Sequence, residues 1–171
     1  MKPLIKEING ITPKIGSDCY ISETATLIGE VICGDRCSFW FNSVTRGDVH
    51  YIKIGNEVNV QDGAIIHCTY KKSPTNIGNQ VTIGHNAIVH GCTIKNRVLI
   101  GMGAIVLDNC IIESDSIIAA GAVLTMGTHV KSGEIYAGVP AKKVKEGDFK
   151  SQLLDLANKY VEYSKWYQKD Q

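Results

Sequence analysis

The sequence lacks an excess of either charge and lacks long hydrophobic runs, and these absences exclude two classes of partner. Eighteen basic and seventeen acidic residues give a net charge of +1, and no segment carries a basic stripe. Nucleic acid is therefore not an expected partner. No run approaches the roughly 18 apolar residues of a membrane span, and residues 1–10 lack the apolar core of a secretion signal. We expect a soluble, cytoplasmic protein with no membrane partner.

The sequence also lacks a paired cysteine motif. Its six cysteines contain no C-x-x-C pair and are Cys19, Cys33, Cys37, Cys68, Cys92 and Cys110. In a chain of 171 residues this distribution is unlike the disulfide framework of a small secreted domain. We therefore expect reduced cysteines that pack as small side chains. The chain length suits one domain with its own core.

Most of the chain follows a six-residue repeat. Apolar residues recur every six positions from Ile15 to Phe39, and a small or β-branched residue stands four positions after each. The pattern resumes at Ile54 and, apart from short interruptions, continues to Leu124. A helical period of about 3.6 cannot place single apolar residues at every sixth position. A fixed period over this length predicts a solenoid whose repeats bury their apolar faces by stacking.

These residues resemble the hexapeptide-repeat proteins, whose fold is a left-handed parallel β-helix of triangular section. The resemblance implies one hexapeptide on each face and three in each coil. It also supplies the handedness, because the general preference of parallel crossovers is right-handed. The expected fold class is all-β, with the β-helix and its N-terminal lead-in in residues 1–147 and a loop near residues 70–76.

The last segment of the chain changes its period. From Phe149 to Tyr167 apolar residues are spaced by three and four, which predicts an amphipathic helix within residues 148–171. Asp148 is the expected N-cap. The apolar stripe must be buried, so we expect the helix to pack on the outside of the β-helix within the same domain.

Stacking of equivalent faces brings distant side chains together, because neighbouring coils lie about 4.8 Å apart, as neighbouring strands do. We treat the interruptions near residues 51–53 and 67–76 as bulges from single faces. One column then carries three side chains in the same slot, namely Arg46, His67 and His90. His85 falls on the neighbouring face, above Gln61 and Asp62.

This stacking predicts a metal site at a subunit interface. His67 and His90 of one chain can share a metal ion, whereas His85 reaches the corresponding site of another subunit. Three imidazoles with an open fourth position are typical of a catalytic zinc. A ring of three subunits fits a triangular prism, so we expect a homotrimer. His50 and His129 lie outside these columns and are interpreted as surface histidines.

The constellation looks like that of the γ-class carbonic anhydrases and their close relatives. The matching segments are WFNSVTRGDVH, NVQDGAIIH and GHNAIVHGC, which carry Asn42, Arg46, Asp48, Gln61, Asp62, His67, His85 and His90. The similarity runs from about Ile11 to the C-terminal helix. It implies a homotrimer whose metal is bound by two histidines of one subunit and one of the next. Zn²⁺ is the expected cofactor, and Fe²⁺ or Co²⁺ also accept three imidazoles.

The resemblance implies the reversible hydration of carbon dioxide to bicarbonate by a lyase. Three neutral imidazoles leave the metal its full charge, which lowers the pKa of bound water to about 7 and provides hydroxide. By resemblance, Gln61 orients the hydroxide and Asp62 belongs to the same polar surroundings. Arg46 holds bicarbonate and pairs with Asp48 and, across the interface, with Asp62. A purely structural salt bridge between subunits is the alternative role for these charged residues.

One loop departs from the best-studied branch of the family. That branch carries an acidic loop after the first ligand, with a glutamate proposed to shuttle protons, whereas residues 67–76 contain no carboxylate. Regenerating hydroxide needs a proton acceptor, so this absence weighs against fast hydration. The chain is more similar to a short-loop branch in which a tyrosine of the C-terminal helix approaches the site. Tyr160 matches that tyrosine, and a place in the apolar stripe is its alternative role.

Two other functions fit parts of the sequence. The repeat and the segment YAGVPAKKVK, residues 136–145, are shared with hexapeptide-class acyltransferases that use acetyl-CoA. The shared fold does not determine the function. Binding of acetyl-CoA without metal would indicate acyltransferase activity. The second alternative is a non-catalytic metal-binding or assembly protein. A small ester or thioester attacked by the same hydroxide is also compatible with the residues.

Overall fold

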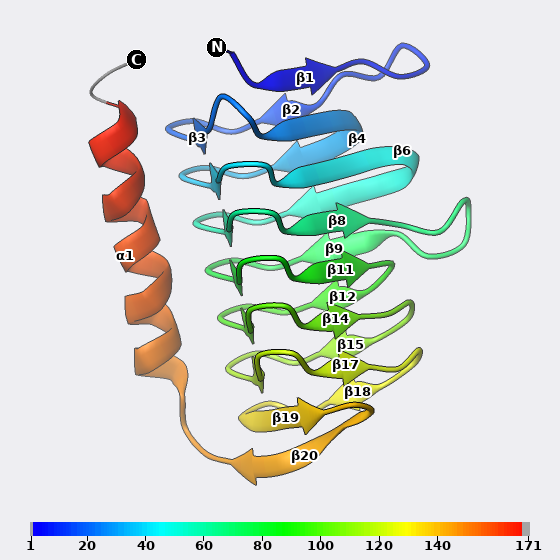
Figure 1. Ribbon diagram of the computed structural model, residues 1–171, viewed down its shortest axis with the longest axis vertical. Coiled ribbons are helices and arrows are strands. Elements are labelled where there is room, and N and C mark those ends of the chain that lie inside the picture. The colour runs from blue at the N-terminus through cyan, green and yellow to red at the C-terminus, as the bar shows by residue number, and fades with distance from the viewer. Residues whose placement is uncertain (1, 169–171) are drawn as a thin grey trace.

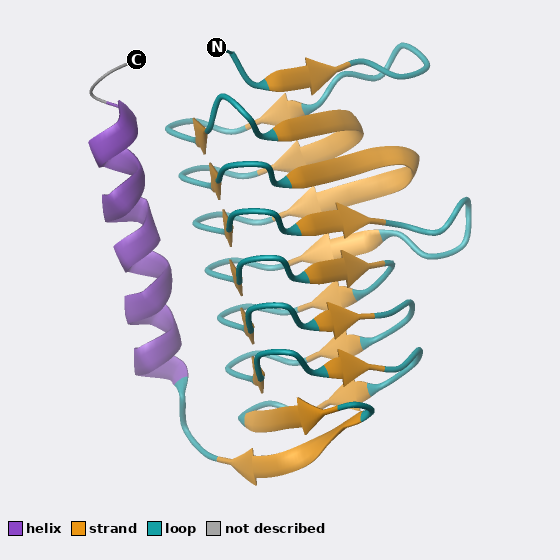
Figure 2. Ribbon diagram, in the orientation of Figure 1, coloured by secondary structure: helices purple, strands orange, loops and turns teal. Residues whose placement is uncertain are grey.

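A computed structural model, which describes residues 2–168, shows a β-helix with one α-helix along its side (Figure 1). The strands nearest the viewer run in one direction, the chain returns along the back, and each coil lies below the preceding one. This path is left-handed. The expected all-β, left-handed parallel β-helix with a C-terminal helix is confirmed, and Figure 2 shows strands on every coil.

The strands form three faces. The first face consists of β1 (Leu4–Lys6), the start of β4 (Thr26–Cys33), the start of β6 (Val44–Ile54), β8 (Ile65–His67), β11 (Ile88–His90), β14 (Ile105–Val106) and β17 (Val123–Leu124). The second face consists of β2 (Lys14–Ile15), the ends of β4 and β6, β9 (Thr75–Ile77), β12 (Thr93–Ile94), β15 (Ile111–Ile112) and β18 (His129–Val130). The third face consists of β3 (Tyr20–Ile21), β5 (Ser38–Phe39), β7 (Asn59–Val60), β10 (Thr82–Ile83), β13 (Leu99–Ile100), β16 (Ile117–Ile118), β19 (Glu134–Gly138) and β20 (Ala141–Glu146).

The strand register confirms the predicted columns. On the first face Thr45 pairs with Ile66, and Ile66 pairs with Val89. On the third face Val60 pairs with Ile83. Among the strands of residues 2–168, all pairings are parallel except that between β19 and β20, which is antiparallel and ends the stack. A spacing in the sequence therefore becomes a vertical contact between coils.

The repeat positions fill the interior of the prism. From Leu27 to Leu124 the leading residue of each hexapeptide is buried, as for Phe39 and Ile83, whereas Ile15 and Ile21 near the open end of the stack are partly buried. Corners between faces turn at a residue with positive φ. At Gly63, where φ is +69°, a Cβ atom would lie 2.3 Å from Oδ1 of Asn86 on the next coil. This corner, which carries Asp62, therefore requires glycine.

Helix α1 (Lys150–Gln168) lies along the third face (Figure 1). The carboxylate of Asp148 accepts a hydrogen bond from the backbone N–H of Lys150 at 3.1 Å, which satisfies a free donor of the first turn. Residues 169–171 of the expected helix lie outside the described residues. Tyr160 packs edge-on against Trp40, with ring centroids 5.7 Å apart. Within residues 2–168, no helix has the apolar length to cross a membrane.

Candidate metal centre

Two histidines on neighbouring coils form the middle of the candidate site. His67 ends β8 and His90 ends β11, and the two residues are register partners. The Nδ1 atom of His67 lies 3.2 Å from the Nε2 atom of His90. The structure therefore brings together the pair that the six-residue repeat predicts.

Each imidazole turns its other nitrogen toward a carboxylate. The Nε2 atom of His67 lies 3.1 Å from Oδ1 of Asp48, and Nδ1 of His90 lies 2.5 Å from Oδ1 of Asp108. Burial raises the pKa of Asp48, but hydrogen bonds from Arg46 and His67 outweigh it and hold the pKa below its usual value. The pKa of Asp108 is lowered in the same way, by Thr69 and His90 against the effect of burial. Both carboxylates are thus ionised acceptors for an imidazole N–H.

This pairing leaves two nitrogen lone pairs facing each other. If Asp48 and Asp108 take the two N–H groups, the facing nitrogens of His67 and His90 are both acceptors. Burial lowers the pKa of His67 more than Asp48 raises it, so the neutral ring is favoured. Two facing lone pairs repel unless a cation lies between them. Metal-binding histidines characteristically donate a hydrogen bond from the N–H of their second ring nitrogen to a carboxylate in this manner.

The distance between the facing nitrogens fits a metal ion. Tetrahedral zinc has Zn–N bonds of about 2.0–2.1 Å, which separates two nitrogen ligands by about 3.3 Å. The observed 3.2 Å agrees with that separation. The donor set of His67 and His90, with a carboxylate behind each ring, therefore fits a divalent cation.

Asp108 is a site residue that sequence reasoning missed. It follows β14 on the coil below, level with Gly91, because the coil shortens to seventeen residues after Val89. A Cβ atom on Gly91 would lie 2.3 Å from Oδ1 of Asp108, so the glycine leaves room for the carboxylate to reach His90. Thr69 donates a hydrogen bond from Oγ1 to the other oxygen of Asp108. The sequence signal for this contact was Gly91 directly after His90, with Asp108 at the equivalent position one coil later.

His85 stands apart from the pair within one chain. It follows β10 at the corner between the third and first faces, and its Nδ1 atom lies 2.9 Å from Oδ2 of Asp62. The side chain of His85 is 42% exposed. Within residues 2–168, the only three-residue group of potential metal ligands is a cluster of cysteines. A single chain therefore supplies two of the three predicted histidine ligands, and the third faces solvent.

The predicted charged residues are partly brought together. Nη1 of Arg46 lies 2.6 Å from Oδ2 of Asp48, which also contacts His67, so the guanidinium stands next to the histidine pair. Arg46 remains 41% exposed and is accessible to a bound anion. Asp62 instead pairs with His85 of its own chain. A contact between Arg46 and Asp62 would need a second subunit.

Gln61 is held in one orientation beside His85. It is buried, and its Nε2 donates to Oδ1 of Asn59 at 3.1 Å, while Nδ2 of Asn59 donates to Oγ1 of Thr82 at 2.9 Å. These bonds leave Oε1 of Gln61 as an acceptor. Gln61 and His85 line a mostly apolar cavity of about 380 Å³ between the third face and helix α1, which Leu156 and Tyr160 close.

The position of Tyr160 is compatible with either of its two predicted roles. Its ring packs on Trp40, as a member of an apolar stripe would, and it also lines the cavity that contains Gln61 and His85. Burial, followed by the nearby charge of Asp62, raises the pKa of Tyr160, so the phenol is protonated at neutral pH.

Two other histidines lie outside the centre. Nδ1 of His50 accepts the backbone N–H of Tyr51 at 2.9 Å, in the bend of β6. Nε2 of His129 lies 3.0 Å from Oε1 of Glu113 on the second face. Neither ring contacts the pair of His67 and His90 or His85.

The chain is similar to known proteins along almost its whole length. Residues 91–125 match the family described as bacterial transferase hexapeptide (six repeats). A protein of Geobacillus kaustophilus named "Carbonic anhydrase" is 36% identical over 96% of this chain and 91% of its own length. "Protein YrdA" of Escherichia coli is 39% identical over 98% of this chain and 95% of its own length. The chain belongs to the γ-carbonic-anhydrase-like family.

A solved structure places this γ-carbonic-anhydrase-like chain among hexapeptide proteins. The hexapeptide transferase family protein from Anaplasma phagocytophilum has a TM-score of 0.92 and 38% identity. The alignment covers 96% of this chain and 98% of that one. Family membership implies a metal cofactor, in agreement with the donor set around His67 and His90. It does not by itself fix the metal or the reaction.

Proposed function

We propose that this protein catalyses the reversible hydration of carbon dioxide to bicarbonate. The proposed assembly is a cytoplasmic homotrimer in which His67 and His90 of one subunit and His85 of the next hold Zn²⁺, with Fe²⁺ or Co²⁺ as alternatives. The observation that carries the proposal is the 3.2 Å approach of two imidazole nitrogens, each ring backed by a carboxylate. Relatives named carbonic anhydrase support the reaction.

The residues around the histidines have distinct tasks. A bound divalent metal supplies Lewis acidity that makes water nucleophilic at neutral pH. The fixed amide of Gln61 offers Oε1 as an acceptor that orients the reacting water. Arg46, held by Asp48 and partly exposed, supplies a positive charge for the bicarbonate anion. Asp62 keeps the ring of His85 in one orientation, so that it can bind across the subunit interface.

The cavity beside Gln61 and His85 suits an uncharged gas. Its walls are mostly apolar, with Leu99 and Ile117 from the third face and Leu156 from helix α1. Carbon dioxide carries no net charge, so it can collect there without the cost of desolvating an ion. Tyr160 closes the cavity toward the helix and is the proposed polar group at its mouth.

Two alternatives have specific support. The structural likeness to a hexapeptide transferase family protein and the apolar cavity favour an acyltransferase that uses acetyl-CoA. The absence of a carboxylate in residues 67–76 favours a non-catalytic or differently specific metal-binding protein. Asp48 and Asp108 would orient the imidazoles in either case, so a measurement of hydration decides between these two functions.

The test is stopped-flow hydration of carbon dioxide by protein loaded separately with zinc and, without oxygen, with ferrous iron. Metal content per chain is measured on the same samples, and His90→Ala is the matched control. We expect activity in at least one metal form and its loss in the control. Stoichiometric metal without hydration would contradict the proposal and favour the non-catalytic alternative. Binding of acetyl-CoA by metal-free protein, again without hydration, would favour the acyltransferase.

A further inference from the structure

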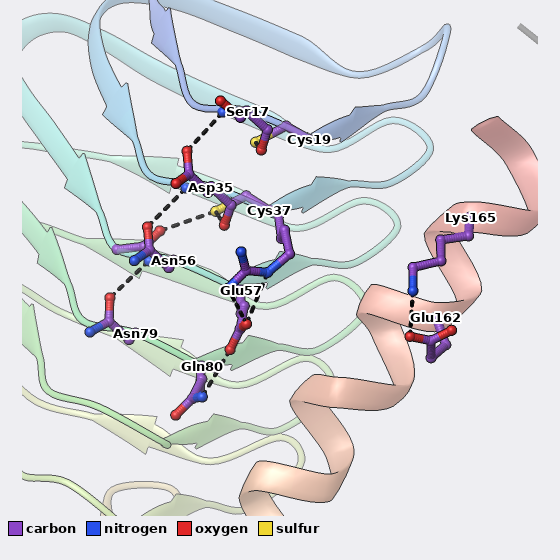
Figure 3. A network of polar contacts seen from close by, with 12 residues as sticks. Ser17, Cys19, Asp35, Cys37, Asn56, Glu57, Asn79, Gln80, Glu162 and Lys165 are labelled. Atoms are coloured by element: carbon purple, nitrogen blue, oxygen red, sulfur yellow. Dashed lines mark hydrogen bonds and ion pairs between the residues drawn. The ribbon is translucent and has the colours of Figure 1, made fainter.

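Three cysteines meet at a corner far from the histidine centre in the fold. The Sγ atoms of Cys19, Cys33 and Cys37 all lie within 4.8 Å of one another. Cys33 ends β4 on the second face, while Cys19 and Cys37 precede β3 and β5 on the third face. Figure 3 shows Cys19 and Cys37 on successive coils of this corner. The histidines lie instead on the first face and at its corner with the third.

Packing does not require cysteine at these positions. On the three coils that follow Cys37, the equivalent residues are Val58, Val81 and Val98. Cys33 stands in register between Ile15 and Ile54. Ser116 follows in the column of Cys37, and other cysteines of the interior, Cys68, Cys92 and Cys110, lie outside the group of three. Three thiols in mutual contact are therefore a local departure from the pattern.

One thiol of the trio is accessible from outside. Cys33 and Cys37 are buried, and Cys19 is half-buried at the edge of the group. Hydrogen bonds from the thiols of Cys33 and Cys37 lower the pKa of Cys19 against the effect of burial. The contact with Cys19 raises the pKa of Cys33 and of Cys37, so these two thiols give up their protons only when a cation binds. In the metal-free protein the thiols of Cys19 and Cys37 donate hydrogen bonds to the carbonyl oxygens of Gly34 and Gly55 at 3.2 Å and 3.1 Å.

We propose that Cys19, Cys33 and Cys37 form a second metal site that binds a thiophilic ion through three thiolates. Sulfur ligands select Zn²⁺, Cu⁺ and related soft ions over Mg²⁺ or Ca²⁺. Zn–S bonds of about 2.3 Å separate two sulfurs by about 3.8 Å, which the observed grouping allows. Binding releases the thiol protons to solvent and involves no oxidation. The site is independent of the histidines and of the proposed hydration.

Cadmium is the probe, because Cd²⁺ bound to thiolate gives an ultraviolet sulfur-to-metal charge-transfer absorption that imidazole ligands do not produce. Reduced, metal-free protein is titrated with Cd²⁺ as wild type and as Cys19→Ser, Cys33→Val and Cys37→Val. We expect the wild-type absorption to saturate at about one ion per chain. Each variant should lose about a third of the absorption and at least about tenfold in affinity. Cys37→Val reproduces the residue of the following coils, and Cys33→Val places an aliphatic side chain in a column of isoleucines, so both variants should fold.

Cys110→Ser is the control, because this thiol is also buried but lies outside the trio. Its titration should match the wild type. Absence of a charge-transfer band in the wild type, or an unchanged band in the three trio variants, would overturn the proposal. As a second readout, equimolar Zn²⁺ should protect Cys19 from alkylation by iodoacetamide, mapped by mass spectrometry. A failure of carbon dioxide hydration has no bearing on either measurement.

Discussion

A single carboxylate, Asp108, fixes the orientation of one proposed metal ligand. Its Oδ1 atom lies 2.5 Å from Nδ1 of His90, and Thr69 holds its other oxygen. Asp108→Asn keeps the shape but removes the charge that stabilises the ring N–H toward it. We expect the affinity for Zn²⁺ to fall by about 10- to 100-fold. Competition with a chelating dye measures this change.

The control for this prediction is Asp115→Asn. Asp115 also carries a carboxylate on a corner of the prism, but it pairs with Arg97 at 2.7 Å, away from the histidines. The zinc affinity of Asp115→Asn should equal that of the wild type. The free energies of unfolding of both metal-free variants should lie within about 1 kcal/mol of the wild-type value. An equal loss of affinity in both variants would show that Asp108 acts only through general stability.

The histidine pair was predictable from the sequence, whereas Asp108 was not. His67 and His90 follow the leading positions Ile66 and Val89, so parallel stacking alone brings them together. The seventeen-residue coil places Asp108 level with Gly91 instead of His90, and its carboxylate reaches back to His90 across the space that Gly91 leaves. Counting equivalent positions in the repeat does not identify a side chain that reaches its partner from the neighbouring position. Side-chain direction, unlike register, needed the structure.

Among the elements, the corners of the prism are joined by a ladder of polar side chains. Oδ1 of Asn79 accepts the backbone N–H of Asn56 at 2.8 Å, and Oδ1 of Asn56 accepts that of Asp35 at 2.9 Å (Figure 3). Asn79→Ala leaves a backbone donor without this partner. Because this hydrogen bond is exposed and water can replace its acceptor, we expect unfolding in urea to show a loss of about 0.5–1.5 kcal/mol.

The variant Asn79→Asp keeps the side-chain volume and an acceptor oxygen, so comparison with Asn79→Ala separates the two contributions to the loss of stability. On an earlier coil, Oδ1 of Asp35 accepts the backbone N–H of Ser17 at 2.8 Å, so aspartate can serve as a rung. The aspartate variant should therefore lose less than half as much stability as the alanine variant. Equal losses in the two variants would mean that the rung hydrogen bond contributes little.

The ionised side chain of Glu57, which lies next to this ladder, predicts that the stability of the fold depends on pH. Hydrogen bonds from Arg36 and then Gln80 lower the pKa of Glu57 against the effect of burial (Figure 3). A lowered pKa means that Glu57 stabilises the fold above its ordinary pKa of about 4.3, and that this contribution is lost as pH falls through the folded value. Glu57→Gln should cost up to about 1 kcal/mol at pH 7 and less at pH 3.

Unfolding free energies of both proteins at the two pH values measure this difference. Glu162→Gln is the control, because Glu162 forms an exposed pair with Lys165 on helix α1. Its effect should be small at both pH values. A cost for Glu57→Gln that is the same at pH 7 and pH 3 would contradict a contribution from the ionised carboxylate.

The elements themselves followed from the repeat, because in-register stacking converts a six-residue spacing into neighbouring strands. The contacts of helix α1 did not follow in the same way. Its apolar period predicted a buried stripe, but the packing of Tyr160 on Trp40 and the cavity beside them depend on how the helix lies on the third face. Periodicity identifies which residues are buried together within a stack. It does not say where an added element docks.

For the whole molecule, the decisive feature is that one chain brings together only two of the three proposed histidine ligands. His67 and His90 face each other, whereas His85 pairs with Asp62 and is 42% exposed at another corner. In a closed ring, each interface would join the pair of one subunit to His85 of the next. His85→Ala and His90→Ala homotrimers would then each lack a complete site at every interface.

Mixed trimers test this arrangement directly. In a trimer assembled from both variants, a His85→Ala subunit can supply the pair and a His90→Ala neighbour can supply His85. Random assembly of equal amounts should restore about one interface in four, and therefore about a quarter of the wild-type zinc per chain. Mixing His67→Ala with His90→Ala should restore none, because no subunit then carries both members of the pair. No recovery in the first mixture, or equal recovery in both, would rule out a site shared between subunits.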